Sequence, residues 1–199
     1  KGLKLHTHNI TAVVTVADDG GSSGILRSDL GMLAPGDVRN CVSALAEVDP
    51  VMGELLNFRF KDGSLKGHSL GNLFLAALNE TSSSFDEAVK KFSHLTGVVG
   101  TVYPVTNESV TLSALLEDGR LIEGESHIGV HHDGPKNGIV KLMVNPEKPK
   151  AVDGVIKALE KADIIVLGPG SLYTSIIPNL LVDGVVDAIK KSNAVKIYV

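Results

Sequence analysis

Two carboxylates and a run of small residues follow directly on a short apolar segment near the start of the chain. Residues 11–16 are β-branched and almost uninterruptedly apolar, which is typical of a strand buried on both faces of a parallel sheet. The segment ends at Asp18 and Asp19, and a loop follows that offers bare backbone and hydroxyl groups, at Gly20, Gly21, Ser22, Ser23 and Gly24. In open α/β sheets, ligands bind beyond the carboxyl ends of the strands, so we expect a binding site here. Asp, Gly and Ser are also ordinary turn residues, which leaves a solvated turn as the alternative.

An arginine follows in a place that helix electrostatics does not favour. Apolar residues at i, i+3, i+4 and i+7 predict a helix with Asp37 as its N-cap, namely Val38, Cys41, Val42 and Leu45. Arg39 and Asn40 then lie in the first turn, next to the positive end of the helix macrodipole. A capping Asp needs no functional explanation, but an anionic ligand would explain Arg39 better.

The next polar region precedes another predicted helix. Its apolar face begins just after Ser69 and comprises Leu70, Leu73, Phe74, Ala77 and Leu78. Small and polar residues crowd its N-terminus, where free N–H groups and the helix dipole favour a phosphate: Gly67, His68, Ser69, Gly71 and Asn72. Two glycines there cost helix stability unless something must approach closely. A lone histidine is commonly structural, but these neighbours favour a functional His68.

A similar junction recurs late in the chain. The apolar residues 164–167 predict a strand that ends in Gly168, Pro169 and Gly170. A helix is expected to start there, with Tyr173 and three hydroxyl residues at its beginning: Ser171, Thr174 and Ser175. The segment is no P-loop, because the Gly-Lys-Ser/Thr ending is missing, but its backbone N–H groups could still hold a phosphate or a carboxylate.

Turn composition explains any one of these junctions, whereas all of them together with Arg39 favour one anionic, phosphate-bearing ligand. A metal is the competing interpretation for a later cluster, His127, His131, His132 and Asp133. That loop is rich in Gly and Pro and is predicted to contain no helix, so nothing would fix the geometry of metal ligands. A solvated loop is therefore favoured there.

The remaining pattern predicts an α/β fold in which a mostly parallel, Rossmann-like sheet is flanked by helices. Residues 110–116 alternate between apolar and polar and return as residues 121–125, which predicts an antiparallel hairpin. Ser84 and Glu87 form a capping box that opens a helix. We expect a single α/β domain over residues 1–199, truncated at both ends, with a β-rich insertion at residues 98–144.

Composition narrows the possible partners. The 199 residues carry 19 Lys and Arg against 23 Asp and Glu, without a basic cluster, so nucleic acid is not expected as a partner. The single cysteine, Cys41, excludes an internal disulfide and fits a reducing compartment. No apolar run approaches the length of a membrane span. We therefore expect a cytoplasmic protein, and leave open whether it forms a homo-oligomer.

Four segments in order resemble the YvcK-type gluconeogenesis factors, within the superfamily of CofD, the 2-phospho-L-lactate transferase. They are residues 16–24, 35–41, 67–73 and 168–175, and the resemblance extends over essentially the whole chain. It implies a Rossmann-like fold and a UDP-sugar ligand, such as UDP-N-acetylglucosamine or UDP-glucose. It also implies a regulatory role in gluconeogenic carbon metabolism and cell shape, with no assigned reaction.

The CofD branch supplies an enzymatic alternative. It implies a transferase that moves a phospholactyl-type group from a GDP-activated donor to a deazaflavin with Mg²⁺, for which Asp19 and Asp37 match the metal ligands. Aromatic residues are scarce, however, which leaves little stacking surface for a tricyclic acceptor. A dinucleotide oxidoreductase is a third possibility, although residues 1–199 show no Gly-x-Gly-x-x-Gly segment.

The favoured hypothesis is thus a regulatory protein that binds a nucleotide sugar, and whether it catalyses a reaction stays open. The diphosphate or its metal would lie at Asp18, Asp19 and the glycine loop. Phosphate or sugar would contact the second group of residues, Arg39, Asn40, His68, Ser69 and Asn72, and residues 168–175 would form the opposite wall. If so, Asp19, His68 and Ser171 must point toward one cleft.

Overall fold

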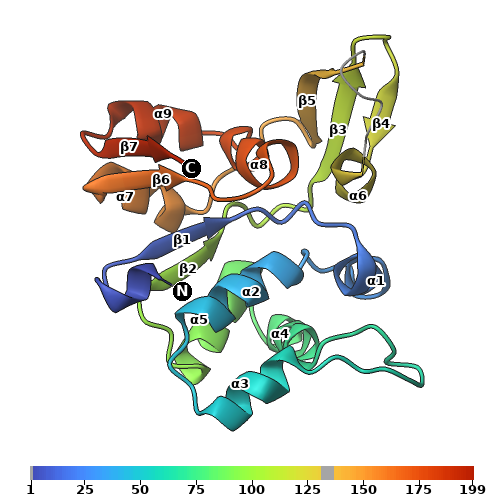
Figure 1. Ribbon diagram of the computed structural model, residues 1–199, viewed down its shortest axis with the longest axis vertical. Coiled ribbons are helices and arrows are strands. Elements are labelled where there is room, and N and C mark those ends of the chain that lie inside the picture. Colours follow the sequence, from blue (N-terminus) through green and yellow to red (C-terminus); the bar gives the residue numbers. More distant parts are fainter. Residues whose placement is uncertain (1, 131–136) are drawn as a thin grey trace.

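Two pairs of parallel strands form the middle of the molecule in the computed structural model, which describes residues 2–130 and 137–199 (Figure 1). β1 (Thr11–Val14) pairs with β2 (Thr101–Pro104), and β6 (Ile164–Leu167) pairs with β7 (Val195–Tyr198). Helices flank both pairs, and a separate antiparallel sheet lies beside them. The expected α/β fold is confirmed, with the parallel strands divided into two two-stranded sheets.

Five helices connect β1 to β2, and in Figure 1 four of them, α2 to α5, lie below these strands while α1 lies to their right. They are α1 (Gly21–Leu30), α2 (Gly36–Leu45), α3 (Pro50–Asn57), α4 (Leu70–Glu80) and α5 (Phe85–Leu95). Their apolar faces and the strands share one core, in which the largest fully buried side chains include Phe92, Leu75 and Val16. Because burial of such side chains contributes most to the stability of a domain, this shared core holds the five helices against β1 and β2.

The starts of these helices agree in part with the sequence patterns. Ser69 is the N-cap of α4, and its Oγ accepts the Asn72 N–H at 3.2 Å, as expected. The prediction of Asp37 as the N-cap of α2 is wrong, because the helix begins at Gly36 after Pro35. Proline lacks an N–H group and has a helix-compatible φ, so it can start the helix without a side-chain cap. Asp37 consequently lies within the first turn.

The glycine-rich loop after Asp19 is shorter than expected. Residues from Gly21 onward already belong to α1, which ends at Gly31 with a left-handed φ of 64°. At Gly24, a Cβ atom would lie 2.1 Å from the backbone oxygen of Asp19, so only glycine allows this turn of α1 to pack against the preceding loop. Ser22 and Ser23 therefore point from a helix and are buried.

The predicted hairpin is present and has a third strand. β3 (Thr111–Leu116) pairs with β4 (Leu121–Glu123) and with β5 (Ile139–Asn145), so the antiparallel sheet has the order β4-β3-β5. A short helix, α6 (Glu125–Gly129), follows β4. Within the expected insertion at residues 98–144, β2 pairs with β1 and belongs to the parallel part.

The helices α7 (Asp153–Lys161), α8 (Ile177–Leu180) and α9 (Val185–Lys191) accompany β6 and β7. A smaller apolar cluster holds this part together, through Val105, Val155, Val182 and Val185. The strands themselves are only partly covered, since Ile164 is 58% exposed and Val166 is 40% exposed. Across the two described ranges, no helix is long and apolar enough to cross a membrane.

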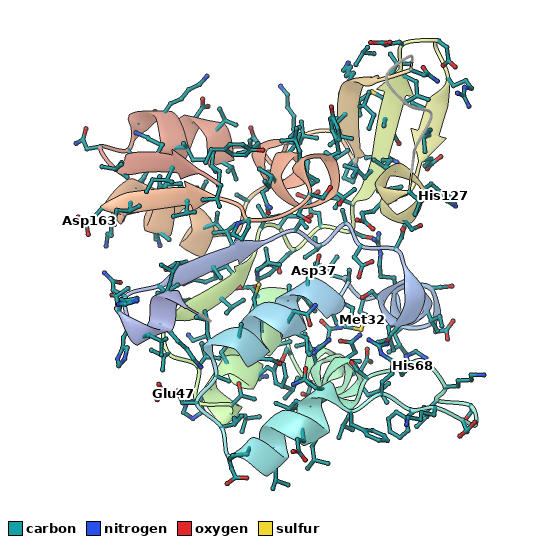
Figure 2. The ribbon with its side chains drawn as sticks, in the orientation of Figure 1. Met32, Asp37, Glu47, His68, His127 and Asp163 are labelled. Carbon is teal, nitrogen blue, oxygen red and sulfur yellow. The ribbon has the colours of Figure 1, made fainter. Side chains whose placement is uncertain are left out.

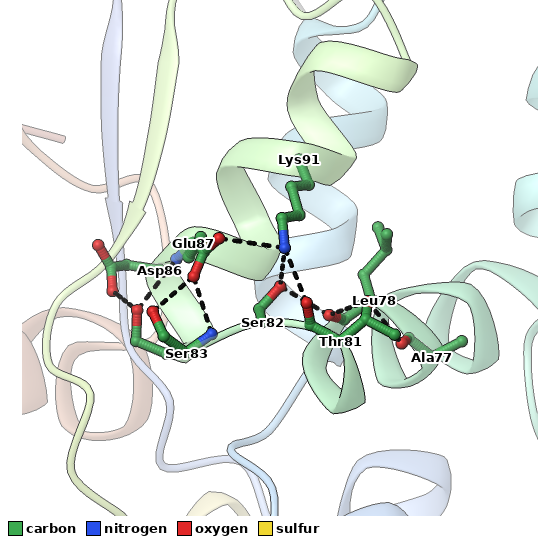
Figure 3. A network of polar contacts seen from close by, with 9 residues as sticks. Ala77, Leu78, Thr81, Ser82, Ser83, Asp86, Glu87 and Lys91 are labelled. Carbon is green, nitrogen blue, oxygen red and sulfur yellow. Dashed lines mark hydrogen bonds and ion pairs between the residues drawn. The ribbon is translucent and has the colours of Figure 1, made fainter.

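The capping box of α5 forms a network of polar contacts around Glu87 (Figure 3). Ser84 Oγ accepts the Glu87 N–H at 3.4 Å, as the capping box predicts. The Glu87 carboxylate reaches one residue further back than expected, because Oε2 accepts bonds from the Ser83 N–H and hydroxyl at 2.8 and 2.5 Å. Lys91 Nζ lies 3.1 Å from Glu87 Oε1. The bonds from Ser83, followed by Lys91, lower the pKa of Glu87 from 4.5 to about 2.

This network predicts an acid-sensitive contribution to stability. A carboxyl group whose pKa is lower in the folded state stabilises the fold above its ordinary pKa of 4.5, and this effect is lost as the pH falls toward 2. The Glu87→Gln variant should therefore melt at a lower temperature than the wild type at pH 7. The two melting temperatures should converge between pH 4.5 and 2. A difference that stays constant over this range, measured by circular dichroism, would contradict the network.

Candidate ligand-binding site

Two helices begin side by side just beyond the carboxyl end of β1. The Gly36 N–H donates to Ser23 Oγ at 3.2 Å, and a Cβ atom at Gly36 would lie 3.1 Å from Asp18 Oδ2. The start of α2 therefore packs against the start of α1 and against the loop that ends β1. Neither helix has a side-chain cap at its N-cap residue, Gly20 or Pro35. Apart from the Gly36 N–H, which donates to Ser23, N–H groups of such first turns can bind an anion.

A buried polar network joins α1 to the start of α4. Ser22 Oγ lies 3.0 Å from His68 Nδ1 and accepts a hydrogen bond from Asn72 Nδ2 at 3.1 Å. All three residues are buried, with Asn72 only 2% exposed. The structure thus brings together three of the predicted site residues that are 46 and 50 positions apart in the chain. Figure 2 shows His68 just before α4 and Asp37 at the start of α2, with Asp163 on the far side of the molecule.

Arg39 extends this network and is the most unusual charge in the site. Its Nε donates to Asn72 Oδ1 at 3.3 Å and its Nη1 to Asn57 Oδ1 at 2.8 Å. The residue is only 7% exposed, yet no ion pair within 4 Å is formed by it in the described part of the chain. Burial and the nearby Arg59 lower the pKa of Arg39. Buried charges are normally paired, so this guanidinium is held in an environment that favours an additional anion.

The predicted close approach at the start of α4 occurs at Gly71. A Cβ atom there would lie 2.9 Å from Arg39 Cδ and 2.6 Å from the Leu56 carbonyl oxygen. The group that approaches is therefore the aliphatic stem of Arg39, together with the backbone at the end of α3. Gly67 has a left-handed φ of 88° in the preceding turn, where no atom crowds it.

Acidic side chains gather on another side of the same region. Burial, followed by repulsion from Asp18, raises the pKa of Asp37, although Arg39 and a hydrogen bond with Asn40 oppose this effect. Glu125, at the start of α6, also has a raised pKa because of burial and repulsion by Asp18, Asp19 and Asp37. The sequence patterns did not indicate Glu125, because it lies in the antiparallel part of the chain.

The predicted metal ligand Asp19 already has protein partners. Its Oδ2 accepts the Glu125 N–H at 3.0 Å and its Oδ1 accepts the Ser126 N–H at 2.8 Å, so the carboxylate holds the start of α6. In residues 2–130 and 137–199, no group of three or more His, Cys, Asp and Glu side chains could hold a metal ion. Both oxygens of Asp19 therefore bind backbone N–H groups, and the assignment of Mg²⁺ to Asp19 and Asp37 stays a prediction from the resemblance.

The histidine-rich segment was expected to lack helix, which is wrong for its first part. His127 lies in α6, and its Nδ1 is 2.8 Å from the backbone oxygen of Glu123. The short helix forms because Asp19, distant in sequence, satisfies its first N–H groups. The predictions for His131, His132 and Asp133 lie outside the described residues.

Of the predicted segment at residues 168–175, Thr174 contacts an acidic residue of the site. Thr174 is buried and hydrogen-bonds with Glu125, which tends to lower the pKa of that carboxyl. It belongs to η3, a π-helix (Leu172–Ile176), and Ser175 N–H donates to the backbone oxygen of Ser171 at 2.9 Å. Ser171, Tyr173 and Gly170 are exposed. Gly168 is half-buried beside the end of β7, where a Cβ atom would lie 2.5 Å from the Val199 oxygen.

A second arginine ties the loop after β1 to the antiparallel sheet. Arg27 Nη1 donates to the Asp18 carbonyl at 3.0 Å and Nη2 to the Val110 carbonyl at 2.8 Å. A cavity of about 370 Å³ lies here, lined by Asp19, Gly24, Arg27, Ser28, Gly31 and Ser109. A larger cavity, of about 740 Å³, lies between α5, β2 and the start of α7 and includes none of the predicted site residues. We place the site at the buried polar network around Arg39, because none of the predicted site residues lines the larger cavity.

Helix N-termini that gather at the carboxyl end of a parallel strand define a class of α/β proteins that bind ligands at that edge of the sheet. Within this class, the chain belongs to the CofD family, because the family model described as 2-phospho-L-lactate transferase CofD matches residues 1–199.

Relatives from several bacteria support this assignment. A relative from Thermoanaerobacterium thermosulfurigenes is 56% identical over the whole chain, which covers 62% of that protein. The gluconeogenesis factor of Bacillus subtilis is 46% identical, and the chain covers 62% of it. A crystal structure of a UPF0052 family protein from Bacillus halodurans superimposes with a TM-score of 0.93 at 46% identity, over 99% of this chain and 62% of that one. The chain spans 43% to 62% of the length of the first relatives.

The packing at Gly71 predicts opposite effects of alanine at two helical glycines. Gly71→Ala should lower the free energy of unfolding by about 1–3 kcal/mol, because the added methyl group overlaps Arg39 and the Leu56 carbonyl. Gly53→Ala in α3 is the matched control, since its Cβ would meet Val48 at an ordinary 3.7 Å. It should gain about 0.5–1 kcal/mol. Urea denaturation distinguishes the two, and equal effects would show that Arg39 does not pack there.

The raised pKa of Asp37 predicts that removing its charge increases the melting temperature in a pH-dependent way. A carboxyl group whose pKa is raised by folding destabilises the folded state once the pH exceeds that pKa, and has no effect below its ordinary value of 3.8. Asp37→Asn should therefore melt at a higher temperature than the wild type at pH 7 to 8. This gain should shrink toward pH 3.8. A lower melting temperature at neutral pH would show that the Asp37 charge is compensated.

Proposed function

We propose that this chain binds a UDP-sugar, UDP-N-acetylglucosamine or UDP-glucose, as part of a cytoplasmic regulator of gluconeogenic carbon metabolism and cell shape. The observation that carries the proposal is the buried guanidinium of Arg39, which has hydrogen-bond partners but no carboxylate within 4 Å among the described residues. The gluconeogenesis factors among the relatives support the metabolic role.

The diphosphate would take the place of the missing counter-charge. Arg39 supplies a fixed positive charge, and the uncapped starts of α1 and α2 supply N–H groups next to it. Backbone N–H groups and guanidinium groups both bind phosphate oxygens through charge-assisted hydrogen bonds. The hydroxyl groups of the sugar would lie toward the carboxylates of Asp18, Asp37 and Glu125, which accept such bonds.

Calorimetric titration of the purified protein with UDP-N-acetylglucosamine, UDP-glucose, GDP and NAD tests this function. Binding of a UDP-sugar without turnover is the expected result. Arg39→Gln should weaken it about 10- to 100-fold, because hydrogen bonds to charged groups contribute about 1.5–3 kcal/mol. Arg120→Gln, at the β3–β4 turn, removes a positive charge elsewhere and should bind like the wild type. Binding that survives Arg39→Gln unchanged would refute this role of the guanidinium.

The enzymatic alternative has one observation in its favour, namely that the matching family model is described as a 2-phospho-L-lactate transferase. A transferase of this type would prefer GDP to UDP-sugars and would turn over a deazaflavin acceptor in the presence of Mg²⁺. The same titrations, repeated with and without Mg²⁺ and followed by a turnover assay, therefore separate the two functions. Preference for GDP together with turnover would replace the regulator by the enzyme.

A further inference from the structure

The hydrogen-bond partners of Arg39 are both electrically neutral. Its Nε and Nη1 donate to the side-chain oxygens of Asn72 and Asn57, at 3.3 and 2.8 Å. In the portion of the chain that the structure describes, Nη2 has no hydrogen-bond partner. A carboxylate in either position would accept the same bond and would also compensate the charge. Two carboxamides instead fix the orientation of the guanidinium and leave its charge in place.

The remaining charges near Arg39 do not compensate it. Arg59, two residues beyond Asn57, repels the guanidinium and thereby lowers its pKa. Asp37 acts in the opposite direction but more weakly, and forms no ion pair with Arg39 within 4 Å. Arg39 and Arg59 thus form a positive part of the site, in which Asp37 is the opposing charge that acts on Arg39. A ligand with a negatively charged group is what this part favours.

Asn57 is itself held by a second hydrogen bond. It ends α3, is exposed, and its Nδ2 donates to the Gly53 carbonyl at 2.8 Å. This bond turns Oδ1 toward Arg39, so the amide has one orientation and both of its ends are used. Asn57 lies in a different helix from the predicted site residues, and no sequence motif pointed to it.

We infer that Asn57 is a positioning residue that holds the Arg39 guanidinium for an anionic group of the ligand without neutralising it. This inference rests on the proposed function for the identity of the ligand, but the anion subsite itself is independent of the nucleotide and the sugar. It assigns the negatively charged part of the ligand to Nη2 of Arg39. It also predicts that adding a negative charge at position 57 weakens ligand binding more than removing the hydrogen bond there.

Two substitutions at this exposed position separate charge from hydrogen bonding. Asn57→Asp should weaken the binding of UDP-N-acetylglucosamine at least about 10-fold, because a carboxylate next to Arg39 competes with the ligand. Asn57→Ala removes the hydrogen bonds to Arg39 and to the Gly53 carbonyl without adding a charge, and should cost only about two- to fivefold. The deficit of Asn57→Asp should shrink at high salt, since screening weakens the competing charge. Asn9→Asp, before the opposite end of β1, is the matched control and should bind like the wild type.

Inorganic pyrophosphate is the second probe, and it keeps this inference distinct from the proposed function. If the wild type binds pyrophosphate but no UDP-sugar, and Asn57→Asp weakens that binding, the anion subsite stands and the nucleotide-sugar function fails. If a UDP-sugar binds and Asn57→Asp equals Asn57→Ala at all salt concentrations, the inference is wrong and the function stands. A wild type that binds neither probe overturns both. Circular dichroism of each variant confirms that it is folded.

Discussion

A buried positive charge without a counter-charge is the constraint on which the arrangement of the site depends. Arg39 is almost fully enclosed, and enclosing a charge raises the free energy of the folded state unless an opposite charge accompanies it. The fold surrounds it with two carboxamides and places its stem against Gly71, where any side chain would collide with it. Three helices, α2, α3 and α4, thereby contact one guanidinium. A substitution that removes its charge therefore also removes contacts that hold these helices together.

The antiparallel sheet contributes to this region. Asp19 binds the first N–H groups of α6, and Arg27 binds the start of β3, so the loop after β1 is fastened to that sheet at two points. This attachment places Glu125 near the carboxylates at the end of β1, where mutual repulsion and burial raise its pKa. The site therefore combines the positive charge of Arg39 on α2 with carboxylates from the loop after β1, from α2 and from α6.

Sequence patterns predicted what depends on neighbours along the chain. The starts of α4 and α5 at Ser69 and Ser84 followed from capping residues and from apolar spacing, both of which act within a few residues. The capping pattern also misplaced Asp37. An Asp precedes the apolar spacing, but the helix begins earlier, after Pro35. Glu125 and Asn57 could not be predicted, since their partners Asp19 and Arg39 are 106 and 18 residues away and no local signal records such a contact.

Gly71 shows where sequence reasoning stops. A glycine in the first turn of a helix costs stability, so its presence correctly indicated that something approaches the backbone. The approaching group turned out to be the protein's own arginine and not a ligand. A close ligand and a close protein side chain both require glycine at position 71. The glycine alone therefore does not distinguish between them. The case for a ligand therefore rests on the arginine that fills this space, because its two hydrogen-bond partners are neutral and it forms no ion pair within 4 Å among the described residues.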